Sequence, residues 1–142
     1  MTLEELARFM EQGIPFNKVL GLKLRSLEKG RALLEVPFRD ELVGDPFRPA
    51  LHGGVLSALA DTAGGAAVWG SVPDPRSRVS TIDLRLDYLR PARLEAVLAD
   101  ARVVRLGNRV GVVDMRLFHE SDEAVTIATG KGVYNVSPPK KA

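Results

Sequence analysis

One aspartate, Asp61, lies in a stretch that is otherwise apolar and small-sided, and it is the only acidic residue between Asp45 and Asp74. The stretch predicts a buried helix, in which aspartate is a poor helix former and an unpaired carboxylate is costly. A salt bridge across an interface, or exposure at a gap in the packing, would explain it structurally. We favour a functional carboxylate.

The tripeptide His52-Gly53-Gly54 precedes this aspartate, where a loop is expected to enter the helix. Backbone amides at a helix N-terminus are unsatisfied and lie at the positive end of the helix dipole. Glycine allows a ligand close to them, so the segment could hold a carbonyl oxygen that gains negative charge. The two glycines could equally serve only a tight loop-to-helix connection, with His52 as the cap.

The helix that would carry these groups is predicted from His52 to Gly70, without proline and with an apolar stripe. The stripe comprises Leu56, Leu59, Ala63 and Ala66. A helix this apolar should be buried, and its small residues from Gly64 to Ala67 should let a neighbouring backbone come close.

The flanking sequence predicts an α+β domain in which a sheet wraps around this helix. A capping box, Thr2 with Glu5, starts a helix that ends near Gly13, and Pro15 starts a second short helix closed by Gly21. A hairpin, a loop over 39–51 and a four-stranded antiparallel meander after the helix complete the prediction. The predicted strands span residues 22–27, 32–38, 79–89, 94–106, 110–119 and 124–135.

Alternation in the first strand after the helix predicts two faces. Ile82, Leu84, Leu86 and Tyr88 should face one way, and Thr81, Asp83, Arg85 and Asp87 the other. One helix cannot cover both faces of such a sheet. We therefore expect the remaining apolar surface to be buried in a homodimer, assembling further into a homotetramer.

Composition is that of an ordinary globular protein. The 142 residues are 45% apolar and 27% charged, with a net charge of +2 and no cysteine. Disulfides and thiolate chemistry are therefore excluded, and no basic block with interleaved aromatics suggests nucleic-acid binding. We expect one domain over 1–136, a flexible tail over 137–142, no membrane segment and a cytoplasmic location.

The motif residues resemble the phenylacetate-degradation type of hotdog-fold acyl-CoA thioesterases. The resemblance is carried by Leu51, His52, Gly53, Gly54, Leu59, Asp61, Gly64 and Ala66, and is supported by the run from Ser80 to Pro91. It covers roughly residues 21–135. It implies a hotdog fold, hydrolysis of an acyl-CoA and an active site shared between two chains.

The resemblance also implies residue roles. Asp61 would be the nucleophile or general base, the Gly54 amide the oxyanion donor and Thr81 the hydroxyl that orients water. His52 and Gly53 would shape the substrate site. Many relatives carry an asparagine where this chain has Pro46, so Asp45 is the candidate to replace it.

Coenzyme A adds phosphates, for which arginine is well suited. Arg90, Asn108 and Arg109 are the candidate contacts, although each arginine could equally be a solvated turn residue. We expect no metal or separate cofactor, and Trp69 favours aryl or medium-length acyl groups. The alternatives are a hotdog hydratase or dehydratase using His52 with Asp61, and a non-catalytic acyl-thioester-binding protein.

Overall fold

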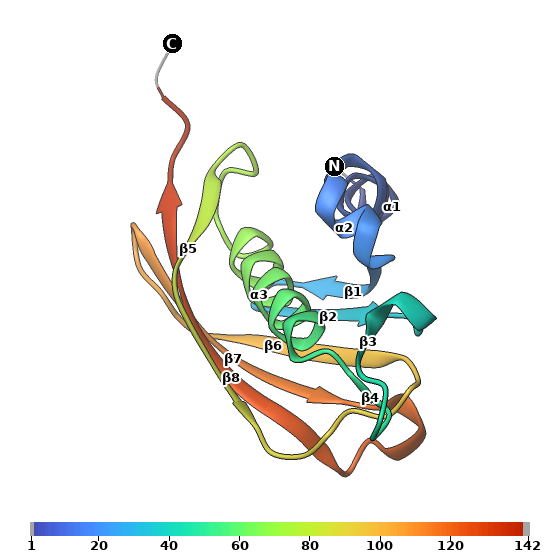
Figure 1. The fold of residues 1–142 in the computed structure, drawn as a ribbon. Helices are drawn as coiled ribbons and strands as arrows, with labels where there is room; N and C mark the ends of the chain where they lie inside the picture. The colour runs from blue at the N-terminus through green and yellow to red at the C-terminus, as the bar shows by residue number, and fades with distance from the viewer. Residues whose placement is uncertain (1, 141–142) are drawn as a thin grey trace.

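One long helix, α3 (Gly53–Trp69), lies inside the curve of a six-stranded antiparallel sheet in the computed structural model, which describes residues 2–140 (Figure 1). The sheet order is β1-β2-β6-β7-β8-β5. Its strands are β1 (Lys23–Glu28), β2 (Arg31–Val36), β5 (Arg78–Tyr88), β6 (Val97–Leu106), β7 (Val110–Phe118) and β8 (Thr126–Ser137). This is the α+β hotdog architecture that the sequence analysis predicted.

The central helix has the predicted ends, with His52 as its N-cap and Gly70 as its C-cap. It packs against β2, β5, β6, β7 and β8, and its buried side chains include Leu56 and Leu59. The close approach expected at Gly64 is made by a side chain rather than by a backbone. A Cβ built there would overlap the Tyr134 hydroxyl and lie 2.8 Å from ring carbon Cζ.

The predicted four-stranded meander is wrong in one respect. β6, β7 and β8 follow one another in the sheet, but β5 pairs with β8, and β6 pairs with β2 instead. The chain therefore crosses from one edge of the sheet to its middle between β5 and β6. Alternation within a strand reports its two faces but not its neighbours, so the sequence pattern could not reveal this crossing.

The alternation predicted for β5 is confirmed from Asp83 to Tyr88 but is wrong for Thr81 and Ile82, because a β-bulge lies between Thr81 and Asp83. A bulge adds one residue to one strand and reverses the phase of the side chains beyond it. Thr81 therefore faces α3, as Leu84 and Tyr88 do further along the strand, and Ile82 is 57% exposed.

The segment predicted as a plain loop over 39–51 contains regular structure. It holds a 3-10 turn η2 (Asp40–Leu42) and a small ladder of β3 (Val43–Asp45) with β4 (Ala50–Leu51). The Asp45 carboxylate accepts the amides of Phe47 and Arg48, each at 3.0 Å. This side-chain turn brings the two short strands together.

The N-terminal segment lies beside α3 at the open side of the sheet (Figure 1). It comprises α1 (Leu3–Arg8), a π-helical segment η1 (Phe9–Gly13) and α2 (Pro15–Leu20). The predicted capping box is confirmed, since the Glu5 amide donates to Thr2 Oγ1 at 3.1 Å and the Thr2 amide to Glu5 at 2.7 Å. Gly21 closes α2 with φ +72°, as glycine at this position suggests.

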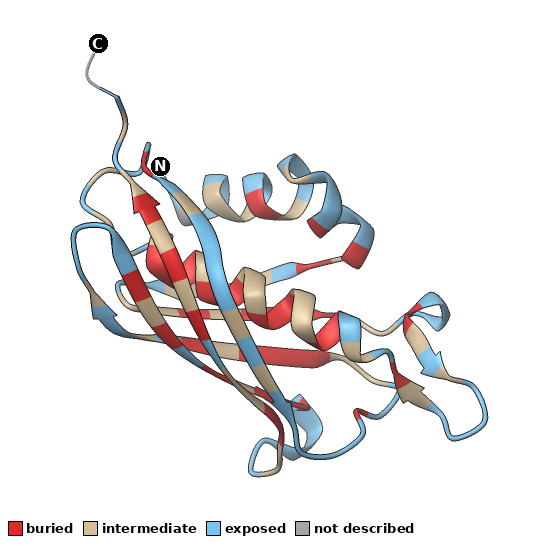
Figure 2. Cartoon of the chain, turned by 60° about the vertical axis from the view of Figure 1, so that its left-hand side comes forward, coloured by how far each residue is buried: buried red, intermediate tan, exposed pale blue. Residues whose placement is uncertain are grey.

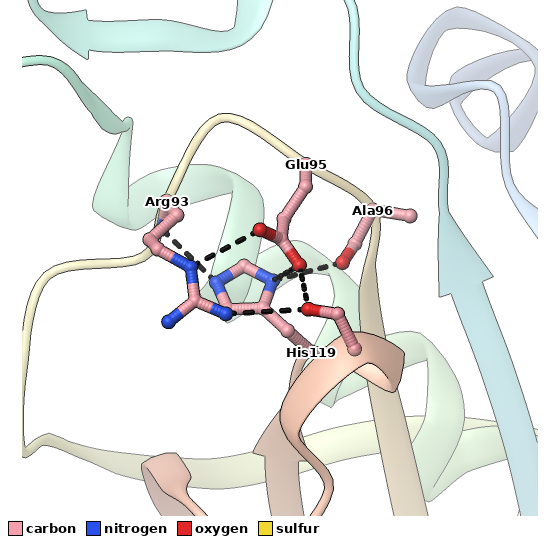
Figure 3. A network of polar contacts seen from close by, with 5 residues as sticks. Arg93, Glu95, Ala96 and His119 are labelled. Atoms are coloured by element: carbon pink, nitrogen blue, oxygen red, sulfur yellow. Dashed lines mark hydrogen bonds and ion pairs between the residues drawn. The ribbon is translucent and has the colours of Figure 1, made fainter.

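The loop before β6 explains why that strand starts at Val97 and not at the predicted Leu94. His119, only 3% exposed, clamps the loop (Figure 3): its Nδ1 lies 2.9 Å from the Ala96 carbonyl oxygen, and its Nε2 lies 3.0 Å from the Arg93 amide nitrogen. Because Nε2 accepts an amide proton, Nδ1 must carry the ring proton and donate to Ala96. The short turn η3 (Glu120–Asp122) follows directly.

The tail predicted for 137–142 remains a prediction. β8 includes Ser137, residues 138–140 have no regular secondary structure, and 141–142 lie outside the described residues. Within residues 2–140, no helix combines the length and apolar character needed to cross a bilayer. The same range contains no group of three or more His, Asp or Glu side chains placed to hold a metal ion.

Candidate active site

The Asp61 carboxylate is held at one oxygen by groups from two paired strands. Thr81 Oγ1 of β5 donates to Asp61 Oδ1 at 2.7 Å, and the Tyr134 hydroxyl of β8 lies 3.4 Å from the same oxygen. Thr81 and Tyr134 are opposite each other in the ladder, so both reach the helix at one level. Within residues 2–140, no hydrogen bond or ion pair engages the second oxygen, Oδ2.

Tyr134 is a site residue that the sequence analysis missed. It is 1% exposed, and its hydroxyl also donates to the Asp61 carbonyl oxygen at 2.9 Å. Burial, followed by the nearby Asp61 carboxylate and its hydrogen bond, raises the pKa of the Tyr134 phenol above its usual value, so the hydroxyl remains a donor. The sequence signal that could have identified Tyr134 is a single aromatic residue in a glycine-rich strand, together with glycine at the centre of the predicted helix.

A cavity of about 700 Å³ opens beside Asp61, between the N-terminal segment, α3 and the start of β5. Thr81 and Tyr134 also line it. Its other walls combine apolar side chains and bare helix backbone with polar side chains. The apolar part comes from Phe9, Met10, Ile14, Gly65, Ala66, Trp69, Pro75 and Val79, and the polar part from Asn17, Thr62, Ser77, Arg78, Ser80, Asn135 and Ser137. The free carboxylate oxygen therefore belongs to a group on the wall of a mainly apolar chamber.

The helix N-terminus is organised separately, at the other end of β5. The Gly54 amide donates to His52 Nδ1 at 2.8 Å, so His52 caps the helix. Tyr88 donates to the Gly53 carbonyl at 2.8 Å and shares a short hydrogen bond with Ser57. His52 and Gly54 are exposed, so a ligand oxygen could replace the imidazole as the acceptor of the Gly54 amide.

Asp61 and the Gly54 amide are too far apart to act on one carbonyl within a single chain. They are seven positions apart on α3, which is about 10 Å along the axis at 1.5 Å per residue. A reacting carbonyl must lie about 3 Å from both the catalytic group and the oxyanion donor. The structure brings Thr81 to Asp61 but leaves Gly54 at a distance.

Asp45 lies apart from the cavity, where its carboxylate makes the turn of the β3–β4 ladder. Its hydrogen bonds from the amides of Arg48 and Phe47 hold the pKa of the Asp45 carboxyl below its usual value. Pro46, next in the chain, is exposed. Asp45 is therefore an ionised group within its own turn.

The three residues predicted to contact the nucleotide of CoA lie at two different ends of the sheet. Asn108 and Arg109 line a second hollow of about 420 Å³, together with Arg105. The Arg109 carbonyl accepts the Val136 amide at 2.7 Å, beside the start of β5, whereas Arg90 follows the end of β5. The length of that strand separates them by about 30 Å, so one chain does not bring Arg90 and Arg109 together.

Comparison with known proteins agrees with this architecture. The profile of the thioesterase superfamily matches residues 49–126. Medium/long-chain acyl-CoA thioesterase YigI of Escherichia coli is 36% identical over 135 residues, which cover 87% of this chain and 86% of YigI.

Solved structures give the same result. A Shewanella oneidensis protein described as related to the thioesterase superfamily superposes with a TM-score of 0.84 at 31% identity, over 95% of each chain. Thioesterase HI1161 of Haemophilus influenzae superposes with a TM-score of 0.81 at 26% identity, over 96% of this chain and 90% of its own.

The fold and these matches together define the class of protein. The chain belongs to the thioesterase superfamily, and it is a thioester hydrolase.

Proposed function

We propose that the protein is an acyl-CoA thioesterase that releases an aryl or medium-chain acid and free CoA, with Asp61 as its catalytic carboxylate. The observation that carries the proposal is the Asp61 side chain itself. One oxygen is fixed by Thr81, and the other is free on the wall of an apolar cavity. The name of the E. coli relative, a medium/long-chain acyl-CoA thioesterase, supports the substrate class.

Ionised Asp61 can start the reaction in two ways. As general base, Oδ2 takes a proton from water, the hydroxide attacks the thioester carbon, and the C–S bond breaks as the thiolate leaves. As nucleophile, Oδ2 attacks that carbon directly, the C–S bond breaks as the thiolate leaves, and water then hydrolyses the resulting anhydride. In both routes the carbonyl oxygen becomes negative and needs a donor. Thr81 would hold the carboxylate, or orient the water beside it.

The donor would be supplied by a second subunit. β5 is an 11-residue edge strand with free backbone groups on one side, and most of its residues are exposed (Figure 2). Such an edge readily pairs with another strand. Antiparallel pairing of two β5 strands about a two-fold axis would place the Tyr88 end of one strand beside the Thr81 end of the other. Gly54 of the partner subunit would then approach Asp61.

The same pairing would place the Arg90 end of one β5 near the Arg109 end of the other chain. It would therefore join the two halves of the predicted nucleotide site, with Asn108 beside Arg109. A homodimer is thus part of the proposal, and further assembly into a homotetramer, membership of the phenylacetate-type subgroup and a cytoplasmic location remain predictions. Asp45 is not needed for the reaction in this scheme, because its carboxylate serves the β3–β4 turn.

Thiol release from a panel of acyl-CoAs tests the reaction. The expected result is free CoA in stoichiometric amount with free acid, without added metal. Loss of alkene absorbance from an enoyl-CoA while the thioester stays intact would instead identify a hydratase. Binding of acyl-CoA without either change would identify a carrier. Either of these outcomes would overturn the proposal.

Complementation tests the shared site. Gly54→Pro removes the amide but leaves proline in the first helical turn, where it is tolerated. Mixed with Asp61→Asn chains, it should regain about a quarter of wild-type activity, since half of the dimers are mixed and each has one intact site. If Asp61 and Gly54 act from one chain, mixing restores nothing. Sedimentation of a fully active monomer would also contradict the shared site.

A further inference from the structure

Gly65 has no structural reason to be glycine in this chain. A Cβ built there would meet only Tyr134 ring carbons, at 3.6 and 4.0 Å, which are ordinary contacts. Its φ is not positive, since only Gly21 and Gly30 have positive φ among the described glycines. Alanine would stabilise the middle of a helix relative to glycine. Something other than packing or backbone conformation must account for Gly65.

The neighbouring Gly64 shows what a structural requirement looks like. A Cβ there would overlap the Tyr134 hydroxyl and the Met115 methyl group. Gly64 is buried against the sheet, whereas Gly65 lines the cavity. The two adjacent glycines therefore need different explanations. Core packing excludes a side chain at Gly64, whereas a side chain at Gly65 would project into the cavity.

Gly65 occupies a particular place in that cavity. Asp61, Gly65 and Trp69 recur every four residues, so they follow one face of α3, and all three line the cavity. The opposite wall is the π-helical segment, through Phe9 and Met10. A ligand that starts at Asp61 and runs along the helix would cross the bare backbone at Gly65.

The far end of this path is an aromatic wall. The Trp69 and Phe9 rings have centroids 6.4 Å apart with planes at 45°, and Trp69 Nε1 donates to the Pro75 carbonyl at 2.9 Å. The hydrogen bond fixes the indole where α3 ends. Asn17 and Ser77 are the buried polar residues of the lining, and the Asn17 side-chain amide is already engaged, because it donates to the Met10 carbonyl at 3.0 Å. The path between Asp61 and Trp69 is therefore suited to an apolar chain.

Helix geometry sets the length of that chain. Trp69 is eight positions beyond Asp61, or about 12 Å at 1.5 Å per residue. An extended alkyl chain advances about 1.25 Å per bond, from a bond of about 1.5 Å and a tetrahedral angle. About ten bonds therefore fill the path, and Gly65 lies about 6 Å, or five bonds, from the carbonyl.

We infer that Gly65 is the floor of an acyl channel that runs along α3 from Asp61, that Trp69 and Phe9 close its end, and that the channel selects acyl groups of medium length. This inference rests on the proposed function, because it places the reacting carbonyl at Asp61. A side chain at Gly65 would narrow the channel only beyond the fifth carbon. Acyl groups that end before that point would not meet it.

The test compares Gly65→Ala with wild type across butanoyl-, hexanoyl-, octanoyl-, decanoyl- and dodecanoyl-CoA. The ratio of kcat/KM for decanoyl-CoA to that for butanoyl-CoA should fall about tenfold or more, which is the cost of a misfit of one methyl-sized group in an apolar pocket. The variant should melt at or above the wild-type temperature. Trp69→Ala should instead raise the ratio of kcat/KM for dodecanoyl-CoA to that for butanoyl-CoA, because it opens the end of the channel.

Gly64→Ala is the matched control, since it adds the same methyl group one residue away. Because it displaces Tyr134 beside Asp61, it should lower the melting temperature and lower kcat/KM for all five substrates alike, without changing the chain-length ratio. In folded Gly65→Ala, by contrast, an equal loss on every substrate, or an unchanged profile, would overturn the channel. Sedimentation of Gly65→Ala must give the wild-type assembly, because a changed assembly would assign the space to a partner subunit and overturn it also.

Binding separates this inference from the proposed function. Non-hydrolysable butyl- and decyl-CoA thioethers are titrated by calorimetry into wild type and Gly65→Ala. If wild type hydrolyses no acyl-CoA but binds the decyl thioether better than the butyl one, and Gly65→Ala removes that preference, the channel stands and the proposed reaction fails. If wild type hydrolyses acyl-CoA with no preference in either assay, the reaction stands and the channel fails.

Discussion

Two polar clusters in this protein are built from similar groups but differ in what they leave free. Around Asp61, Thr81 and Tyr134 occupy one carboxylate oxygen, and the cluster faces a cavity of about 700 Å³. Around His119, both ring nitrogens are engaged, by the Ala96 carbonyl and the Arg93 amide (Figure 3). None of the His119 cluster lines that cavity.

The difference separates a group that can react from a group that holds structure. A buried polar network in which every member is satisfied makes the local structure unique and rigid. The His119 ring fits that description, since it is 3% exposed and both of its nitrogens are engaged; beside it, nearer the surface, Glu95 accepts from both Arg93 and Ser121. At Asp61, one oxygen is left for a substrate or a water molecule. Histidine is the more usual catalytic residue, yet here the aspartate is the group with an unengaged atom.

Among changes in the Asp61 cluster, Asp61→Asn should give the largest effect on activity. The amide cannot accept a proton or attack a thioester, so kcat should fall by about 10²- to 10⁴-fold. The fold should survive, because the oxygen of the introduced amide can still accept from Thr81 and the desolvated charge is gone. Circular dichroism and thiol release measure the two properties. Near wild-type turnover in a folded variant would show that the free oxygen is not the reactive group.

His119→Asn should give the largest structural effect. Asparagine can keep the donor near Nδ1 but loses the acceptor at Nε2, so the Arg93 amide is left without its partner, at a cost of about 2 kcal/mol in the free energy of unfolding. Urea denaturation measures the loss, and kcat below the transition should stay at the wild-type value. Because Ala92, beside Arg93, accepts the Leu51 amide at 3.1 Å, a fall in kcat of the folded variant would show that the loop also positions the start of α3.

The fold could be predicted largely from local patterns. The capping box at Thr2, the helix from His52 to Gly70 and the number of long strands all follow from spacing and turn residues. The pairing of β5 with β8 and the bulge near Ile82 could not, because both depend on contacts between segments far apart in the chain. The bulge matters most, since it turns Thr81 toward Asp61.

The candidate site could be predicted only where a residue breaks its local pattern. Asp61 is conspicuous because aspartate is unfavourable in an apolar helix. Tyr134 is not, because tyrosine is ordinary in a strand, and its importance comes from Gly64 facing it across the core. The separation between Asp61 and Gly54 follows from helix geometry alone. Its relevance to a site shared between two subunits depends on β5 being an edge strand, which the sequence does not reveal.

Thr81→Ala sharpens the comparison within the Asp61 cluster. Loss of its hydroxyl frees the Asp61 carboxylate to rotate, and kcat should fall about tenfold because a hydrogen bond to a charged group is lost and Tyr134 compensates in part. Thr81→Ser is the matched control, since it keeps the hydroxyl and should stay close to wild type. A loss as large as that of Asp61→Asn would give Thr81 a central chemical role. No loss would reduce it to a strand residue.

Glu95→Gln should give the smallest effect, and one that depends on pH. The hydrogen bonds of Glu95 with Arg93 and then with Ser121 lower the pKa of its carboxyl from the ordinary value of 4.5. A carboxyl with a lowered folded-state pKa stabilises the protein above its unfolded-state pKa, and this contribution disappears as pH falls through the folded-state value. The melting temperature of wild type should therefore exceed that of Glu95→Gln at neutral pH, and the gap should close below about pH 4.5. Glu41→Gln, at an exposed position, controls for the loss of a surface charge. A gap that is constant with pH would mean that the carboxylate charge contributes nothing to the clamp, and a fall in kcat would place Glu95 on the catalytic side of the comparison.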